Sequence, residues 1–342
     1  MRTPTMHDVA TTAGVSQATV SLVLNNTGGT RVSQETRDRV LAAVSEVGYR
    51  TNAAAKTLRD GTAGLVGFIG DVVASSPFAG RIVEGAQERA WQDGLLMMVV
   101  NTGGDRELER ASIEALLSHQ VVGIVYASMY HQRLELPDVL RTVPTVVLNS
   151  VDAEGGIRSV IPDEFGGGRA ATEVLIGAGH SRIGMINIET LDSALPAAIG
   201  RHAGYVDALK SAGIAIDRRL VREGHGGSDD GYRLTAELMA IDKPPTALFC
   251  ANDRTAWGAY NALRDLGMRV PDDVSIVGFD DVPLAAYFDP PLTSIRVPAY
   301  DLGLAAGHAL LDRIAGREVP SRTLLPTELI VRASTGSPAM RA

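Results

Sequence analysis

A regular alternation of continuous apolar runs with helical patterns, from residue 65 onward, constrains the fold of this chain most. The apolar runs cover residues 65–69, 95–100, 123–126, 145–148, 183–188, 247–250 and 274–278. Helical patterns separate them at residues 80–92, 107–118, 168–177, 201–212 and 255–266. Strands that are apolar on both faces are typical of parallel sheets covered by helices on both sides. The alternation is too long for one sheet, so we predict two doubly wound parallel-sheet subdomains.

The length and composition of the chain are those of a globular protein. Its 342 residues are enough for two or three domains, and 45% of them are hydrophobic. No apolar run has the length of a membrane helix, and the N-terminal residues lack the apolar core of a signal peptide. The single cysteine, Cys250, lies in an apolar run and cannot form an internal disulfide. We therefore expect a core cysteine and a reducing cytoplasm.

The net charge of −8 is unevenly distributed along the chain. Residues 1–60 carry seven Lys/Arg and five Asp/Glu, whereas the remaining residues carry 25 and 35. A slightly basic N-terminal module therefore precedes an acidic body. Because net charge is a sum over both parts, the acidic total does not exclude a nucleic-acid partner for the first part.

The first fifty residues have the pattern of three short helices. Thr5 is placed to cap a helix over residues 6–13, Ser16 one over residues 17–24, and Ser33 one that ends near residue 47. Gly14 can supply the left-handed turn between the first two helices. Two short helices joined by such a turn, with a third for the core, form the helix-turn-helix plan. An ordinary three-helix domain without a ligand is the alternative on spacing alone.

In this plan the second helix reads DNA in the major groove. Ser16 is placed for a phosphate, and Gln17, Ala18, Thr19 and Leu22 are placed for base edges. The side chains of Ala18 and Leu22 have no hydrogen-bonding group. They can contact thymine methyl groups but cannot make a bidentate contact with guanine.

The segment MHDVATTAGVSQATVSLVLN at residues 6–25, VSQETRDRV at residues 32–40 and the pair Gly48-Tyr49 together resemble LacI/GalR-family bacterial transcriptional regulators. The resemblance implies a homodimer that binds a pseudo-palindromic operator at the nucleoid, in the bacterial cytoplasm. It implies backbone contacts from Thr5, Ser16, Thr19, Ser21 and Asn25, base contacts from Gln17, Ala18 and Leu22, and flanking contacts from Arg31, Ser33, Thr36 and Tyr49.

Residues 51–62, TNAAAKTLRDGT, join the two parts of the chain. The AAAKTLR core has high helix propensity but is too short to hold a helix alone in water. The resemblance implies a hinge helix that pairs with its copy in the minor groove. Leu58 would wedge between base steps, with Asn52 and Ala55 nearby. A plain flexible tether is the alternative.

Polar residues follow several predicted strands, at the edge where doubly wound sheets bind ligands. Asp71, Asn149, Asn252 and Asp280 each follow an apolar run, and Arg201 opens a helix after a long loop. Amides, carboxylates and a guanidinium that converge on a cleft suit a polyhydroxylated ligand such as a sugar.

The body also resembles the same family as far as about residue 329. CANDRTAWGA at residues 250–259, VGFDD at 277–281 and RHAGY at 201–205 are similar to its effector-domain motifs. This implies a periplasmic-binding-protein-like core with Arg201, Asn252, Asp280 and Asn149 as effector contacts. Phe78 is a further candidate, as one apolar face. The loop GHGGS at residues 224–228 departs from the family because His225 is its only ring.

These patterns predict a domain organisation. We expect an all-α headpiece at residues 1–50, the hinge at 51–62, an α/β body at 63–330 and a tail at 334–342. One subdomain of the body covers about 63–162 and 294–325, and the other about 163–293 and 326–333. The tail lacks leucine heptads, so the tetramer-forming helix of the lac repressor is missing and a dimer is expected.

Other chemistries have weaker support. The pairs Asp280-Asp281 and Asp272-Asp273 lack a histidine or third carboxylate for a metal. Glycines 166–168 could cradle a phosphate before a helix, but no P-loop lysine follows and they more readily ease a domain crossover. Asp253 is explained equally well as a helix cap.

Function follows from these features taken together. No catalytic motif and no cofactor motif occurs, so we predict a DNA-binding regulator, most simply a repressor, that responds to a sugar by allostery rather than an enzyme. A solute-binding protein for transport and a carbohydrate-processing enzyme are the competing classes. The identity of the effector, the sign of its effect and the operator sequence stay open.

Overall fold

The structure, a computed structural model, describes residues 4–24, 32–49, 64–72 and 77–338. It divides into two compact units, Met1–Ala63 and Gly64–Ala342. Each unit has its own hydrophobic core. None of the helices in the described ranges combines the length and apolar character that crossing a bilayer requires.

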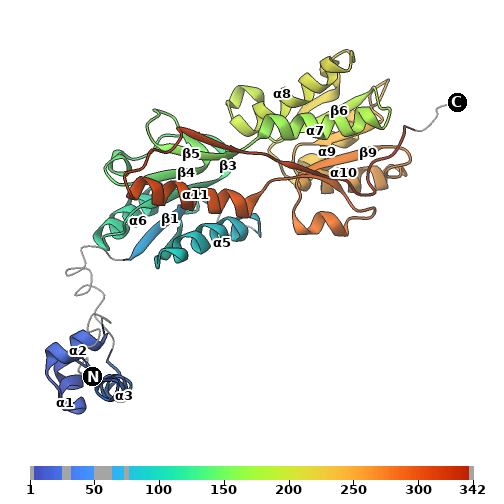
Figure 1. The fold of residues 1–342 in the computed structure, drawn as a ribbon. Helices are drawn as coiled ribbons and strands as arrows, with labels where there is room; N and C mark the ends of the chain where they lie inside the picture. The colour runs from blue at the N-terminus through green and yellow to red at the C-terminus, as the bar shows by residue number, and fades with distance from the viewer. Residues whose placement is uncertain (1–3, 25–31, 50–63, 73–76, 339–342) are drawn as a thin grey trace. The chain divides into compact units, whose positions relative to one another are not determined.

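The described part of the N-terminal unit consists of α1 (Met6–Ala13), α2 (Gln17–Leu24) and α3 (Gln34–Val47) (Figure 1). Gly14 ends α1 in the left-handed region, with φ of 65°, and so turns the chain toward α2. All three helices contribute to the core, through Val9, Ala10, Ala13, Val20, Val23, Val40 and Ala43. The predicted helix-turn-helix headpiece is confirmed.

The second unit contains two six-stranded sheets in its described residues. The first has the order β11 (Arg322–Leu325), β5 (Arg158–Pro162), β4 (Thr145–Asp152), β3 (Ile124–Leu134), β1 (Leu65–Gly70) and β2 (Leu96–Asn101). The second has the order β12 (Glu328–Ile330), β10 (Thr293–Arg296), β9 (Ser275–Asp280), β8 (Ala247–Cys250), β6 (Ile183–Asn187) and β7 (Val221–Glu223). The strand pairs described are parallel except β10 with β12. The predicted pair of doubly wound subdomains is confirmed.

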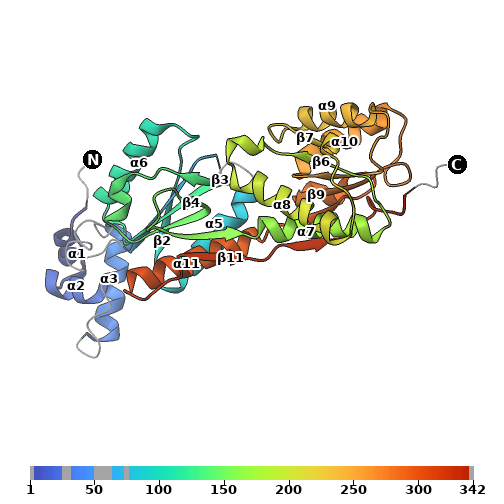
Figure 2. The same cartoon turned by 90° about the horizontal axis from the view of Figure 1, so that it is seen from above.

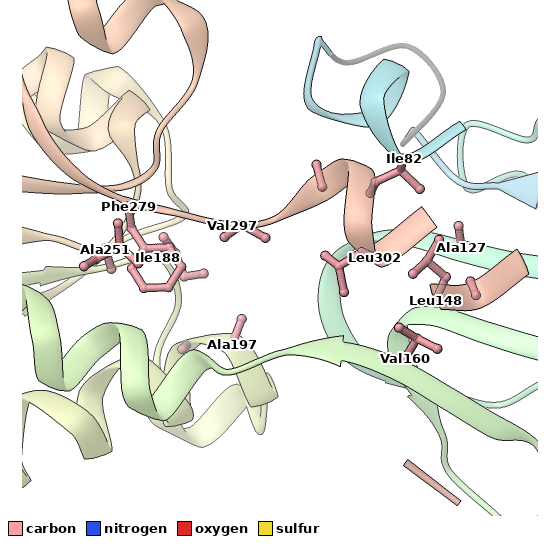
Figure 3. Packing of buried hydrophobic residues seen from close by; sticks show 14 of the residues in the cluster. Ile82, Ala127, Leu148, Val160, Ile188, Ala197, Ala251, Phe279, Val297 and Leu302 are labelled. Carbon is pink, nitrogen blue, oxygen red and sulfur yellow. The ribbon is translucent and has the colours of Figure 1, made fainter. Parts of the chain in front are cut away.

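Helices cover both sheets (Figure 2). The first subdomain has α5 (Pro77–Gln92), α6 (Arg106–Ser118) and α11 (Ala299–Ile314), and the second has α7 (Glu164–Gly177), α8 (Pro196–Ser211), α9 (Ser228–Met239) and α10 (Asp253–Asp265). Short 3-10 helices lie at Asp138–Arg141, Leu191–Ser193, Arg218–Leu220 and Pro283–Tyr287. Figure 3 shows the buried side chains, with Val297 on the segment between the group around Phe279 and the group around Leu148.

The chain crosses between the subdomains after β5, after β10 and after β11. Residues Ser294–Arg296 pair with Gly278–Asp280 of β9, so they belong to the second sheet. The predicted boundary at residue 294 was therefore wrong by about three residues, because the strand continues past the point where we placed the crossing.

The predicted tail at residues 334–342 was also wrong in its first part. Ser334 is fully buried, its hydroxyl donates to the Ile276 carbonyl at 2.6 Å, and it accepts from the Thr293 backbone N–H at 2.7 Å. His180 contacts the Gly336 carbonyl at 2.9 Å. These residues therefore complete the second subdomain.

Strands β3 and β4 run further than the apolar runs that predicted them. Strand β3 continues past Tyr126 to Leu134, and β4 continues past Leu148 to Asp152. The register of β3 on β4 shifts between Ala127 and Gln132. Such an irregularity turns side chains away from the regular pleat.

The glycine run at residues 166–168 lies inside α7, not before it, because the helix begins at Glu164. A Cβ on Gly168 would lie 2.3 Å from the Arg201 carbonyl oxygen, and one on Gly167 would lie 2.7 Å from the Phe279 ring. The predicted crossover role was wrong. The absence of side chains lets α7 pack closely on α8 and β9.

Candidate functional site

The N-terminal ends of the headpiece helices carry the hydroxyl groups that the sequence assigned to phosphates. Thr5 accepts from the Asp8 N–H at 3.4 Å, Ser16 from the Thr19 N–H at 3.1 Å, and Ser33 from the Thr36 N–H at 3.3 Å. Each hydroxyl therefore caps a helix whose free backbone N–H groups favour an anion. These ends could hold phosphates.

The outer face of α2 carries the predicted base contacts. Gln17 and Ala18 are exposed and Leu22 is half-buried, whereas Val20 and Val23 pack into the core. The neighbouring positions Thr19 and Ser21 are half-buried. The face therefore presents one amide and two apolar groups, as the helical spacing predicted.

The sequence missed a neighbour of this face. His7, on α1, is exposed, and its Nδ1 lies 3.1 Å from the Gln17 Nε2. Spacing along a helix could not signal this contact, because ten residues and a turn separate the two side chains.

The remaining predicted DNA contacts divide between described and undescribed residues. The Thr36 hydroxyl accepts from the hydroxyl of the cap residue Ser33 at 3.0 Å, and Tyr49 is half-buried against the headpiece core. Asn25, Arg31, Asn52, Ala55 and Leu58 lie outside the described residues. So does the side chain of Phe78, although its backbone belongs to α5.

In the second unit, a cavity of about 580 Å³ lies between the two subdomains. Strands β3, β4 and β5 provide one side of it, and the segments that follow β9 provide much of the other. Its lining consists of Met129, Tyr130, His131, Asn149, Pro162, Glu164, Arg201, Arg254, Asp280, Val282, Pro283, Leu284 and Val297. The cavity thus combines apolar walls with a small set of polar groups, as small-molecule sites do.

Arg201 lies at the centre of the polar set and is 5% exposed. Its Nε donates to the Glu164 Oε2 at 2.7 Å, and its Nη2 lies 3.8 Å from the Asp280 Oδ1. Burial disfavours the charged guanidinium, yet the two carboxylates outweigh this and raise its pKa. The guanidinium carbon also lies 3.8 Å from the centre of the Phe279 ring. This arrangement fixes a buried cation at the cavity wall.

Asp280 is the titratable group of this set. Its backbone is in the left-handed region, with φ of 105°. Burial raises the pKa of its carboxyl group from 3.8 to about 6, although Arg201 opposes the change. A carboxyl group in this position can therefore change charge near neutral pH.

The raised pKa of Asp280 predicts a pH-dependent stability. The folded chain binds a proton that the unfolded chain releases, so the contribution of Asp280 is full below about pH 4 and is lost as pH rises through about 6. We expect the unfolding free energy of the wild type, minus that of Asp280→Asn, to fall by about 1–2 kcal/mol between these limits. Urea unfolding at several pH values measures this difference, and a constant difference would contradict the shift.

Asn149 is buried and also has positive φ, at 54°. Its side-chain amide donates to the Ser128 carbonyl at 3.0 Å and the Met129 carbonyl at 2.9 Å. It therefore holds the irregular part of β3 that precedes Tyr130 and His131, and it lines the cavity itself.

Asn252 does not line this cavity. It is 1% exposed and caps α10, accepting from the Thr255 N–H at 2.7 Å and donating to the Gly226 carbonyl at 3.0 Å. Asp253 is not the cap that we considered. Its buried carboxylate accepts from Ser294 at 2.6 Å and from the Val282 N–H at 2.8 Å. Asp253 thus holds the segment at Val282, which lines the cavity, whereas Asn252 holds the loop at Gly226.

Two further residues left open by the sequence also lie away from the cavity. Asp281 forms ion pairs with Arg296 at 2.8 Å and Arg332 at 2.7 Å. His225 is exposed, 3.3 Å from the Glu189 Oε2. Cys250 is fully buried in β8, as expected of a core residue. The described residues contain no group of three metal-ligating side chains.

The structure adds Tyr130, His131, Glu164 and Arg254 to the candidate site. Arg254 on α10 donates to the hydroxyl of Tyr130 on β3, so the contact joins the two subdomains. Tyr130 and His131 follow the apolar run that predicted β3, and Glu164 precedes the predicted start of its helix. A hydrophobic pattern carries no signal for such positions.

Two family models match the chain. The model of bacterial regulatory proteins of the lacI family matches residues 5–52. The model of a periplasmic binding protein-like domain matches residues 172–335.

Full-length relatives are similar over almost the whole chain. The HTH-type transcriptional repressor PurR of Haemophilus influenzae strain PittEE is 36% identical, covering 97% of this chain and 99% of the relative. PurR of Vibrio atlanticus strain LGP32 is 32% identical, covering 97% and 98%.

Solved structures agree with these relatives. The lac repressor dimer bound to operator and the anti-inducer ONPF is 28% identical, with a TM-score of 0.83, covering 98% of this chain and 100% of that chain. The complex of the transcriptional regulator CelR with cellobiose is 32% identical, with a TM-score of 0.69, covering 97% and 99%.

Proposed function

Because the chain belongs to the lacI family of bacterial regulatory proteins, we propose that a small molecule bound between its two subdomains controls its affinity for operator DNA. The chain is a DNA-binding transcriptional repressor, not an enzyme. The observation that carries the proposal is the network of buried Glu164 and Arg201 with half-buried Asp280, at a cavity lined from both subdomains.

A ligand in this cavity can act on the relative positions of the subdomains. Asn149 and Tyr130 belong to the first sheet, whereas Arg201 and Asp280 belong to the second subdomain. A ligand that bonds to both sets binds one arrangement more tightly and shifts the population toward it. Through the hinge at residues 51–62, which lies outside the described residues, this shift would change operator affinity.

On the DNA side, we propose a homodimer that binds a pseudo-palindromic operator. The similarity to the lac repressor dimer bound to operator supports this assembly. Helix α2 would enter the major groove with Gln17, Ala18 and Leu22 toward the bases. The caps of the three helices would hold phosphates, and Leu58 with Asn52 and Ala55 would occupy the minor groove.

For the effector, we propose a neutral sugar. A sugar hydroxyl both donates and accepts, which matches a lining that includes guanidinium, carboxylate and amide groups. The CelR complex, in which the bound molecule is cellobiose, supports this class. A small planar heterocycle is the second candidate, because Tyr130, Leu284 and Val297 provide apolar surface in the same cavity.

A thermal-shift screen of the full-length chain separates the two classes. The panel contains monosaccharides, cellobiose, sugar phosphates, nucleobases and nucleosides. A ligand at 100 times its Kd stabilises the folded state by about 2.7 kcal/mol, which raises the melting temperature measurably. Stabilisation by a sugar supports the first candidate, and stabilisation confined to the heterocycles contradicts it.

The recognition helix gives a separate prediction. We expect Gln17→Ala to weaken operator binding about tenfold or more, because a bidentate side-chain contact contributes about 1–3 kcal/mol of discrimination. Binding to non-operator DNA should stay within about twofold, since phosphate contacts dominate it. Gel-shift titration with operator and non-operator DNA tests this prediction. An equal loss of affinity for the two DNAs would show that Gln17 does not contact the bases.

A further inference from the structure

His131 is a buried histidine in the lining of the candidate site. It lies in the irregular stretch of β3, between Ala127 and Gln132, where the register on β4 shifts. It is 9% exposed, and it lines the cavity between the subdomains. No motif in the sequence singled it out.

The Nδ1 atom of His131 has no hydrogen-bond partner within the described residues. The Glu164 Oε1 lies 3.9 Å from this nitrogen, which is beyond hydrogen-bond distance. Leaving a buried polar nitrogen without a partner is unfavourable. A polar atom of a ligand could therefore supply the hydrogen-bond partner that the Nδ1 atom of His131 lacks.

Glu164 is fixed on the opposite side of this gap. Its Oε2 accepts from the Arg201 Nε at 2.7 Å, so its Oε1 faces His131. A third atom that lies to one side of the line joining two atoms 3.9 Å apart can be about 2.8 Å from both of them. One oxygen or nitrogen of a ligand can therefore bond to both side chains.

The charges around the gap restrict what that ligand group can be. Burial lowers the pKa of the His131 imidazole, and the Glu164 carboxylate opposes this effect. Arg322 and Arg201 act in the same direction as burial. The Glu164 carboxylate repels an acid group placed beside it, whereas a hydroxyl group can donate to Glu164 and accept from the Nδ1–H of a neutral imidazole.

We propose that His131 and Glu164 jointly bind one hydroxyl group of the effector, and that this pair of side chains selects a hydroxyl over an acid group at that position. The inference rests on the proposed function, since it assigns part of the same cavity. His131 lies on a strand of the first sheet, whereas Glu164 begins a helix of the second subdomain. A shared hydroxyl therefore also links the two subdomains.

The test uses the full-length chain and a defined panel of D-glucose, D-ribose, cellobiose, glucose 6-phosphate and gluconate. Thermal shift identifies the compound that the wild type binds best, and calorimetry gives its Kd. We expect a neutral compound to bind, and His131→Leu to weaken it 10- to 100-fold. His131→Asn, whose amide can replace Nδ1, should restore the Kd to within about fivefold of the wild type.

The controls separate a binding role from a structural one. Operator affinity without ligand should be the same in wild type, His131→Leu and His131→Asn, which shows that the variants fold. His225→Ala changes an exposed histidine outside the cavity, so it should leave the Kd unchanged.

Several results would overturn the inference. These are an unchanged Kd in His131→Leu, a preference for the phosphate or the acid, and binding of no neutral compound. If Arg201→Ala abolishes binding and His131→Leu does not, the assignment of His131 fails while the proposed function stands. If neither variant changes the Kd, the cavity is not the effector site and the proposed function fails.

Discussion

Replacing Arg201 by alanine should weaken effector binding about 100-fold or more while leaving operator binding in the absence of effector within about twofold. The guanidinium is buried and bonds to Glu164 at 2.7 Å, so its removal leaves an unpaired carboxylate in the cavity wall. Breaking a buried pair in this way costs about 3–5 kcal/mol, and part of that loss falls on the folded state itself. Calorimetry with the compound selected by thermal shift measures the affinity, and gel-shift titration measures operator binding.

Arg264→Ala is the matched control for this variant. Arg264 is on α10, its side chain is 72% exposed, and it contacts Asp265 at 3.4 Å. Removing an exposed arginine of this kind should change stability by less than about 0.5 kcal/mol and effector affinity not at all. Normal effector binding by Arg201→Ala would show that the site has been misplaced.

A large effect on stability is expected from Gly168→Ala, in the first half of α7. The new Cβ would lie 2.3 Å from the Arg201 carbonyl oxygen and 2.7 Å from the Arg201 Cα. Both atoms belong to the backbone of α8, so neither can move aside without separating the helices. The gain in helix propensity, about 1 kcal/mol, is smaller than the strain of forcing an atom into this contact. We expect the unfolding free energy to fall by about 2–3 kcal/mol.

Gly177→Ala provides the comparison within the same helix. A Cβ at Gly177 meets no atom within 4 Å, so alanine should be neutral or should stabilise by up to about 1 kcal/mol. Urea midpoints of the two variants test the pair of predictions. If both variants unfold at the wild-type midpoint, the close approach of α7 to α8 is wrong.

The three-helix headpiece and the two helix-covered parallel sheets could be predicted from the sequence because local patterns determine them. The helices of the headpiece begin at residues that can cap them, α1 and α3 end at glycines, and the predicted bounds of α1 and α2 agree with the structure. Apolar runs located β1, β2, β3, β4, β6, β8 and β9, but not β5 or β10, which also lie inside the sheets. The ends of β3 and β4 were missed because polar residues interrupt the apolar runs there.

The candidate effector site was only partly predictable. Arg201, Asn149 and Asp280 line the cavity, whereas Asn252 caps α10 and lies outside it. A polar side chain that follows a strand can either cap the next helix or contact a ligand. The sequence spacing is the same in both cases, so it cannot distinguish the two roles. Tyr130 and His131 reach the cavity through an irregular strand pairing, and such pairings depend on the neighbouring strand.

The most direct test of the account is the affinity of the chain for its effector with and without operator DNA. Coupling between two sites is reciprocal, so operator must change effector affinity by the factor by which effector changes operator affinity. We expect equal factors of about 5–150 in the wild type and no change in Arg201→Ala. Effector affinity that is identical with and without operator in the wild type would contradict control of DNA binding from this cavity.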